Sequence, residues 1–289
     1  MEEEKPCCNY VNTALCFTGS KFKLLNQIIP EMDFTKNYFV DLFAGSGVVG
    51  FNVVNKYEKV LLNDIIKDLI EIHKEIIYNS GIFINKVKSL VVSKEDQKGF
   101  NHLRENYNMN NSAEGLYALM LCSTNNFMRF NKSLKYNQTF GKRTFSDSTQ
   151  EKLNNFINYI LPFRDKLIFT NKDFNMINII KPSMIYIDPP YSSVQDEYGN
   201  ISNKKISEAG YNNLYKKEDD VRLYNYIVEL NKNKHSFMLS GLLVHDGKQS
   251  WIMNKLIRDG FKYKELNFNY NSVSKKGKKD STEIIIMNY

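Results

Sequence analysis

The stretch Tyr38-Phe39-Val40-Asp41-Leu42-Phe43-Ala44-Gly45-Ser46-Gly47-Val48-Val49-Gly50 decides the fold of this 289-residue chain. Its first six residues form an apolar run of strand length, and the glycines that follow allow a tight turn into a helix. A second apolar strand covers residues 59–62 and ends at Asn63-Asp64. A strand–turn–helix–strand unit has a right-handed crossover, so we predict two parallel strands at the centre of an α/β sheet.

The glycine turn is also a candidate nucleoside site, because ligands of open α/β sheets bind at the carboxyl ends of the strands. Gly45 would let a ligand approach the backbone, and Asp64 could accept both hydroxyls of a ribose. NAD and S-adenosylmethionine both carry such a ribose. The carboxylate of Asp41 would attract the ammonium of S-adenosylmethionine and repel a pyrophosphate, so the sequence favours S-adenosylmethionine.

A second motif, Asp188-Pro189-Pro190-Tyr191, follows an apolar strand at residues 183–188. The two prolines fix the backbone and remove two N–H donors, which leaves a carboxylate and carbonyl oxygens at the sheet edge. Asp188 and the Pro189 carbonyl could each accept one N–H of an exocyclic amine. Tyr191 could stack on the base, a contact worth about 1–3 kcal/mol. The motif predicts methylation of an amino group through orientation and electrostatic preorganisation.

Composition narrows the class of protein. With 42% hydrophobic residues and 6 prolines the chain is not a disordered or low-complexity protein. The 39 Lys and Arg exceed the 32 Asp and Glu, and the net charge of +7 favours a polyanionic partner without establishing one. No apolar run reaches about 18 residues and the N-terminus is acidic, so we expect a cytoplasmic protein. The four cysteines form no CxxC pair or Cys/His cluster, so we expect no metal.

The predicted secondary structure changes from strands to helices between the second strand and the strand at residues 166–170. Residues 66–160 are predicted to be mostly helical, and strands resume beyond them, with further strands at 236–240, 263–270 and 283–289. We therefore predict one domain made of residues 1–65 and 161–289, and an inserted domain of residues 66–160. Between Gly115 and Ser146 the chain has five basic residues and no acidic one, so residues 129–145 could form either a β-hairpin that enters a groove of a nucleic acid or a solvated basic loop.

In their order, Phe17-Thr18-Gly19-Ser20-Lys21, the Asp41–Gly47 turn and Asp188-Pro189-Pro190-Tyr191 resemble motifs of the Dam-like DNA adenine-N6 methyltransferases, the α group of the D12 class. The resemblance continues through residues 129–131, 140–144 and 283–288, and is strongest to phage and bacterial Dam enzymes. It implies a Rossmann-like S-adenosylmethionine-dependent methyltransferase sheet with an inserted, mostly helical DNA-recognition domain. It also implies an adenine flipped out of duplex DNA, at a GATC or related site.

The resemblance also implies roles for individual residues. The catalytic residues would be Asp188, Pro189, Pro190 and Tyr191. Cofactor-binding residues would be Phe17, Lys21, Asp41, Phe43, Ala44, Gly45, Asp64, Asp173 and Phe174. Arg129 would contact a guanine, with Asn131 beside it, and Asn125 would contact the thymine left by the flipped adenine. Lys142 and Arg143 would contact phosphates.

The chain departs from that family at three positions. Thr124 stands where the family often inserts an aromatic ring into the base stack, Thr139 replaces a base-reading proline, and Cys16 replaces a guanine-reading lysine. Residues 192–206 are predicted to form a mobile loop that closes over the extruded base. Lysines 275, 276, 278 and 279 either touch the DNA backbone or form a hairpin tip in water.

Two other functions stay open at this stage. The chain could be an S-adenosylmethionine-dependent methyltransferase of RNA adenine or of a protein amide, or a catalytically silent DNA-binding homologue. The expected partners are double-stranded DNA and, in a restriction-modification pair, an endonuclease that shares the site without a stable complex. We expect no membrane partner, and we expect a monomer, or two copies on one DNA site.

Overall fold

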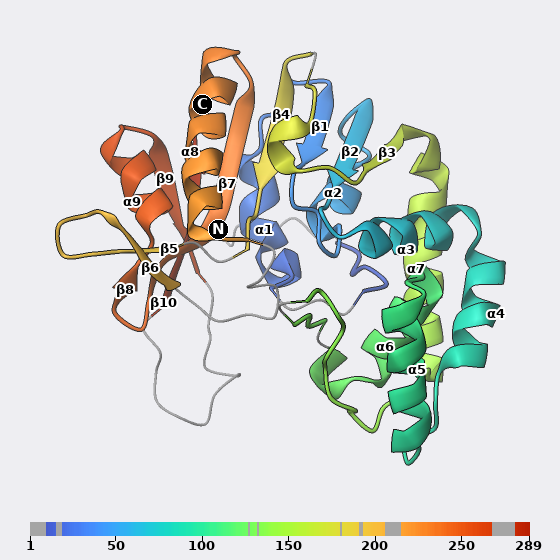
Figure 1. Ribbon diagram of the computed structural model, residues 1–289. Coiled ribbons are helices and arrows are strands. Elements are labelled where there is room, and N and C mark those ends of the chain that lie inside the picture. Colours follow the sequence, from blue (N-terminus) through green and yellow to red (C-terminus); the bar gives the residue numbers. More distant parts are fainter. Residues whose placement is uncertain are drawn as a thin grey trace, which may run out of the picture.

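The computed structural model describes residues 10–15, 19–126, 128–131, 133–179, 181–190, 193–205, 215–267 and 281–289. In this part of the chain a mixed eight-stranded sheet has the order β3-β2-β1-β4-β7-β10-β9, with β8 paired to β7 (Figure 1). The strands are β1 (Tyr38–Asp41), β2 (Lys59–Asn63), β3 (Leu167–Thr170), β4 (Ser183–Ile187), β7 (Ser236–His245), β8 (Lys248–Gln249), β9 (Lys262–Leu266) and β10 (Ser281–Met287). This sheet confirms the predicted α/β class.

The central strands run parallel, as predicted. Strand β1 pairs with β2 on one side and with β4 on the other, so that Tyr38 lies opposite both Lys59 and Ser183. Strands β3 and β7 continue the parallel set, and only β10, β9 and β8 pair antiparallel. The chain leaves β1 toward β2 but returns to the other side of β1 at β4. A crevice therefore opens at the carboxyl ends of β1 and β4, where Asp41 and Asp188 lie.

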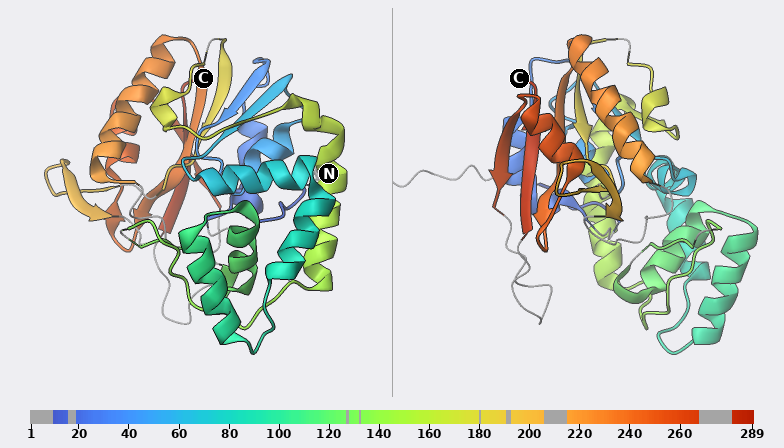
Figure 2. Two further views of the ribbon diagram at one scale, coloured as in Figure 1. Left: turned by 45° about the vertical axis from the view of Figure 1, so that its right-hand side comes forward. Right: turned by 60° about the vertical axis from the view of Figure 1, so that its left-hand side comes forward.

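Side chains alternate between the two faces of the sheet and build two cores. Phe39 and Tyr186 belong to a core with α1 (Leu25–Ile28) and α2 (Val48–Val53). Val40 and Ile187 face the other way and pack with α8 (Lys217–Lys232) and α9 (Trp251–Arg258). The sheet therefore lies between two helical layers, as Figure 2 shows.

The stretch predicted to be helical forms α3 (Lys67–Tyr78), α4 (Ser80–Leu90), α5 (Gln97–Met109), α6 (Ala113–Cys122) and α7 (Asp147–Ile160). Helix α6 is buried along its whole length, and α3, α4 and α5 pack against it. Side-chain oxygens cap three helices: Asp96 begins α5, Ser112 begins α6 and Ser146 begins α7. These helices gather in a lobe beside the sheet (Figures 1 and 2).

The predicted β-hairpin at residues 129–145 is much reduced. Only isolated antiparallel bridges join Phe130 to Tyr136 and Ser123 to Phe140 in the described part of this segment. Leu134 and Lys142 have left-handed backbone conformations, with φ of 57° and 52°. Such residues interrupt a regular strand, so the segment is a folded loop with hairpin-like pairing.

Where we predicted a mobile loop, the described residues form a second hairpin, β5 (Ser193–Gln195) with β6 (Ile201–Lys205). The carboxylate of Asp196 accepts the backbone N–H groups of Tyr198 and Asn200, and Gly199 has a φ of 80°. These are turn-forming contacts that the residue types allow. Ser192, Ile206 and the lysines at 275–279 lie outside the described residues, so no structural statement applies to them.

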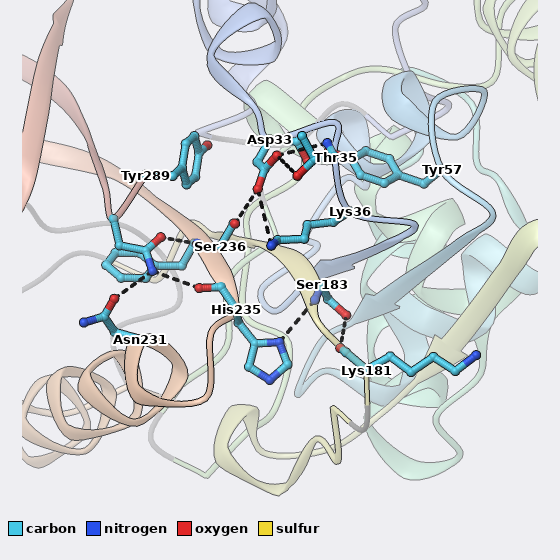
Figure 3. Close-up of polar contacts among 12 residues, drawn as sticks. Asp33, Thr35, Lys36, Tyr57, Lys181, Ser183, Asn231, His235, Ser236 and Tyr289 are labelled. Atoms are coloured by element: carbon cyan, nitrogen blue, oxygen red, sulfur yellow. Dashed lines mark hydrogen bonds and ion pairs between the residues drawn. The ribbon is translucent and has the colours of Figure 1, made fainter.

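Polar contacts join the strands at their amino ends, opposite the carboxyl ends where the crevice lies (Figure 3). The Ser236 hydroxyl donates to Asp33 at 2.5 Å, and Nδ1 of His235 accepts the backbone N–H of Ser183 at 3.2 Å. The serine and the histidine thus use separate partners. This Ser, His and Asp grouping is not a proton relay for a nucleophile, and it serves to hold the starts of β4 and β7.

No helix among the described residues is long and apolar enough to cross a membrane. They also contain no group of three His, Cys, Asp or Glu side chains placed to hold a metal ion.

The glycine turn gives a test of the fold. Gly47 has a φ of 70°, and a Cβ there would lie 2.3 Å from Cε2 of the buried Phe51. We expect Gly47→Ala to lower the free energy of unfolding by about 1–3 kcal/mol in urea denaturation. The control is Gly81→Ala in α4, where a Cβ meets nothing within 4 Å and alanine favours the helix. Equal effects of the two substitutions would contradict this account.

Candidate functional site

A pocket opens at the carboxyl ends of β1, β2 and β4. It brings together residues that the sequence analysis singled out from distant parts of the chain: Lys21, Asp41, Phe43, Ala44, Gly45, Asp64, Asp173, Phe174, Asp188, Pro189 and Pro190. The two other predicted pocket residues, Phe17 and Tyr191, lie outside the described residues. The strand-end rule accounts for Asp41, Asp64 and Asp188 in this cavity, whereas Lys21 reaches it from a turn that precedes β1.

A half-buried ion pair forms the floor of the pocket. The Lys21 ammonium lies 2.8 and 2.9 Å from the two carboxylate oxygens of Asp188, and 3.4 Å from Oε1 of Glu283. Ser240 also hydrogen-bonds Asp188, and its hydroxyl lies 2.7 Å from that of Tyr186. A carboxylate has about four lone-pair positions, so Asp188 keeps capacity to accept a ligand N–H beside Lys21.

Burial and charge act against each other in this pair. Burial by itself lowers the pKa of Lys21, but the carboxylates of Asp188 and Glu283 outweigh it and raise that pKa well above its usual value. Burial raises the pKa of Asp188, although the neighbouring ammonium opposes the shift. Lys21 therefore stays protonated and its charge supports an ionised Asp188 in a place where water is largely excluded.

The glycine turn is held from both sides. The two carboxylate oxygens of Asp64 accept the backbone N–H groups of Gly45, at 3.0 Å, and Ile66, at 2.9 Å. The Gly45 carbonyl lies 2.9 Å from Nε2 of His73, which must be the donor because a carbonyl only accepts. Burial raises the pKa of Asp64 to about 6 and lowers the pKa of His73 to about 4. His73 is therefore neutral at pH 7.

His73 was missed in the sequence analysis, although the sequence contains a signal. It lies on the apolar face of α3, among Leu69, Ile72 and Ile76, and it is 1% exposed. A buried polar side chain on such a face needs a hydrogen-bond partner, but the sequence does not say which one.

Asp41 has a carboxylate oxygen without a partner. It is buried at the end of β1 and lines the pocket, and its Oδ1 makes no hydrogen bond within the described residues. Burial raises the pKa of Asp41 well above its usual value, and the charge of Asp188 adds to the shift. A buried acceptor without a donor is costly, so the site suits a ligand that brings a cationic N–H group.

Aromatic side chains form one wall of the pocket. The rings of Phe43 and Phe174 lie 5.4 Å apart, and Tyr215 meets Phe43 edge-on at 6.2 Å. The guanidinium of Arg222, from α8, lies 5.0 Å from the Phe174 ring and donates to Asp173 at 2.7 Å. Such a wall suits a flat ring of a ligand. Tyr215 and Arg222 were not predicted, because both are distant in sequence: Tyr215 lines the pocket from just before α8, and Arg222 contacts the pocket residues Asp173 and Phe174.

The predicted DNA-contacting residues gather on the loop between α6 and α7. Asn125, Arg129, Lys142 and Arg143 are exposed, and Asn131 is half-buried. The Asn131 carboxamide oxygen accepts the backbone N–H groups of residues 133 and 135, so it serves the turn itself. The loop therefore presents cationic groups to solvent.

Two of the three departures from the resembling family lie next to each other on this loop. The Thr124 N–H donates to the Thr139 carbonyl at 3.0 Å, and their hydroxyls are also 3.0 Å apart. The third, Cys16, lies outside the described residues.

Comparisons with known proteins agree with this geometry. The family model for the D12 class N6 adenine-specific DNA methyltransferase matches residues 17–278. The chain is 31% identical to modification methylase StsI of Streptococcus sanguinis and 28% identical to type II methyltransferase M.FokI of Planomicrobium okeanokoites. Each match covers 97% of this chain but only 43% of the relative, so the chain spans less than half of their length. It is also 25% identical to the DNA adenine methylase of Haemophilus influenzae, over 63% of this chain and 65% of that one.

The low pKa of His73 predicts an acid-sensitive contribution to stability. Its folded pKa of about 4 lies below the ordinary histidine pKa of 6.5, so the unfolded state binds more protons between these values. The stability is complete above pH 6.5 and is lost as the pH falls toward 4, by up to about 3 kcal/mol. In His73→Gln, which keeps an N–H donor but does not titrate, this loss should be absent.

Urea unfolding of both proteins from pH 4 to 7.5 measures the difference. Asp64 acts in the opposite sense, because its raised pKa contributes stability that is lost as the pH rises through about 6. Both proteins keep Asp64, so its effect cancels in the comparison. Parallel pH curves for the wild type and the variant would contradict the role given to His73.

Proposed function

Because the chain belongs to the D12 class N6 adenine-specific DNA methyltransferase family, we propose that it transfers a methyl group from S-adenosylmethionine to N6 of an adenine flipped out of duplex DNA. One observation carries the proposal. The Asp188-Pro189-Pro190 turn and the glycine turn, remote in sequence, line the same pocket with Asp41 and Asp64. Flipping is required because N6 of a stacked base cannot enter such a pocket.

The pocket residues fit S-adenosylmethionine. The unpartnered oxygen of Asp41 would accept its ammonium, Asp64 would accept the ribose hydroxyls, and the wall of Phe43 and Phe174 would hold its adenine. Phe17 and Lys21 are proposed at the methionine end, with Ala44 and Gly45 wrapping the cofactor and Asp173 beside its adenine. When bound, the cofactor supplies an electrophilic methyl group.

Asp188 and Pro189 would orient the target amine. Each offers an oxygen that can accept one N–H, so both protons of the amino group would be held and its lone pair would be directed into the pocket. Lys21 keeps Asp188 ionised, which makes it a better acceptor. Pro190 stiffens the turn, and Tyr191 is proposed to stack on the base.

The exposed loop between α6 and α7 is proposed to meet the DNA. We assign recognition to residues 66–160 and catalysis to residues 1–65 and 161–289. Arg129 would read a guanine, Asn125 would face the orphaned thymine, and Lys142 and Arg143 would neutralise phosphates, with Asn131 shaping the loop. The proposed target is a GATC or related site.

The relatives named modification methylases support a place in a restriction-modification pair. The proposed partner is an endonuclease that shares the site without a stable complex, and the protein would act as a monomer or as two copies on one site. Its substrate would place it in the cytoplasm of a bacterial or phage-infected cell.

Transfer of labelled methyl groups tests the proposed function. We expect transfer from S-adenosylmethionine to duplex DNA, reduced about a hundredfold or more in Asp188→Ala, because the amine loses an oriented acceptor. The control is Asp165→Ala, whose side chain is 95% exposed. Transfer to RNA or to protein amides but not to DNA would favour a methyltransferase of another substrate. DNA binding without any transfer would mean a silent homologue.

Binding of S-adenosylmethionine should depend on the ionisation of Asp64. As the pH falls through about 6, its carboxyl gains a proton and loses part of its capacity to accept hydroxyls. We expect calorimetric affinity to weaken below pH 6 in the wild type, and Asp64→Ala to raise the dissociation constant about tenfold at pH 7.5. Asp64→Asn keeps one acceptor oxygen and should bind with a flatter pH dependence. An unchanged affinity in Asp64→Ala would remove Asp64 from the binding site.

A further inference from the structure

Arg129 and Asn137 form a closed pair on the exposed loop. Nε of Arg129 donates to Oδ1 of Asn137 at 3.0 Å, and Nη2 donates to the Asn137 backbone carbonyl at 2.9 Å. The Asn137 N–H donates in return to the Arg129 carbonyl at 3.0 Å. Three hydrogen bonds thus fix the arginine although its side chain is exposed.

Buried aromatic residues next to Arg129 and Asn137 in the sequence support the pair. Phe130 and Tyr136, the neighbours of the two residues, pack edge-on at 5.8 Å, and Tyr136 is 1% exposed. Asn108 of α5 accepts the Tyr136 N–H at 2.7 Å and donates to its carbonyl at 3.0 Å. The guanidinium is therefore anchored to the helical lobe, and it does not sit on a freely moving tip.

The two hydrogen bonds to Asn137 leave one edge of the Arg129 guanidinium available to a ligand. Asn137 occupies the side edge, formed by Nε and Nη2, and the Arg129 guanidinium makes no other hydrogen bond or ion pair with the residues that the structure describes. The end edge keeps one N–H on Nη1 and one on Nη2. These two parallel donors match O6 and N7 of guanine in the major groove.

We infer that Asn137 is a positioning residue for base reading, and that Arg129 reads guanine with its Nη1–Nη2 end alone. This inference rests on the proposed function. A free arginine would lose several rotamers on binding, and Asn137 removes much of that loss beforehand. A guanidinium held in one orientation favours binding only when its two acceptors also have fixed positions, as O6 and N7 do on the edge of a guanine.

Arg143 offers the contrast within the same loop. Its Nη1 donates to Oδ1 of Asn126 at 3.1 Å. That single contact at one end of the group leaves the Nε and Nη2 edge for another partner. A phosphate can be approached from many directions, so a loosely held arginine suits it. The pairs Arg129–Asn137 and Arg143–Asn126 are therefore matched for an experiment.

The experiment first maps the adenines that the wild type methylates in genomic DNA by sequencing. Methyl transfer is then measured on duplexes in which each base pair of that site is changed, and each guanine is replaced by 7-deazaguanine, which lacks N7. Arg129→Ala should lose discrimination about 10- to 100-fold at one base pair. Asn137→Ala should lose discrimination about fivefold at the same base pair. The double variant should show the same discrimination as Arg129→Ala alone.

Two control variants make the result specific. Asn126→Ala should change the affinity for DNA equally on all duplexes. Asn137→Asp, which keeps the acceptor oxygen, should retain the discrimination at the base pair that Arg129 reads. Unaltered melting temperatures would show that the variants fold.

The inference is overturned if Asn137→Ala keeps full discrimination, if it loses activity equally on every duplex, or if Arg129→Ala shows no base preference of its own. These results leave methylation by the wild type intact. Absence of DNA methylation by the wild type would instead overturn the proposed function.

Discussion

The rest of the site depends on the ammonium of Lys21 between two carboxylates. The half-buried Asp188 and the buried Glu283 both lie within its reach, and Asp41 adds a second buried carboxyl at the neighbouring strand end. Burying several like charges without a counter-charge would drive them to the neutral form. Removing one partner of such a group leaves an uncompensated charge, which is far more costly than losing an exposed ion pair. The Lys21 ammonium thus keeps the floor of the pocket polar and acceptor-rich.

That cation reaches the floor through tertiary packing. Lys21 begins a short 3-10 turn ahead of β1, whereas Asp188 follows β4 and Glu283 lies on β10. Nearer the N-terminus, Oδ1 of Asn52 in α2 accepts the N–H of Val11 at 2.8 Å. The pocket therefore exists only in the folded chain, and local sequence alone could not form any part of it.

The residues at the strand ends could be predicted from the sequence, but the side chains that contact them could not. Asp41, Asp64 and Asp188 follow buried strands, and parallel pairing brings such ends to one edge, so their meeting could be foreseen. His73 and Arg222 could not, because a helix face shows that a side chain is buried or exposed but not what lies opposite. The same limit applies to the loop after α6, where left-handed residues and side-chain contacts replaced the regular strands expected from the pattern.

The hydrogen bond from His73 to Gly45 joins helix α3 to the glycine turn. Helix α3 also packs against α6, at whose end the Arg129 loop begins. The helical lobe and the glycine turn are therefore coupled. A chimera that exchanged residues 66–160 for the corresponding part of another protein would need a neutral donor at position 73, or the glycine turn would lose this hydrogen bond.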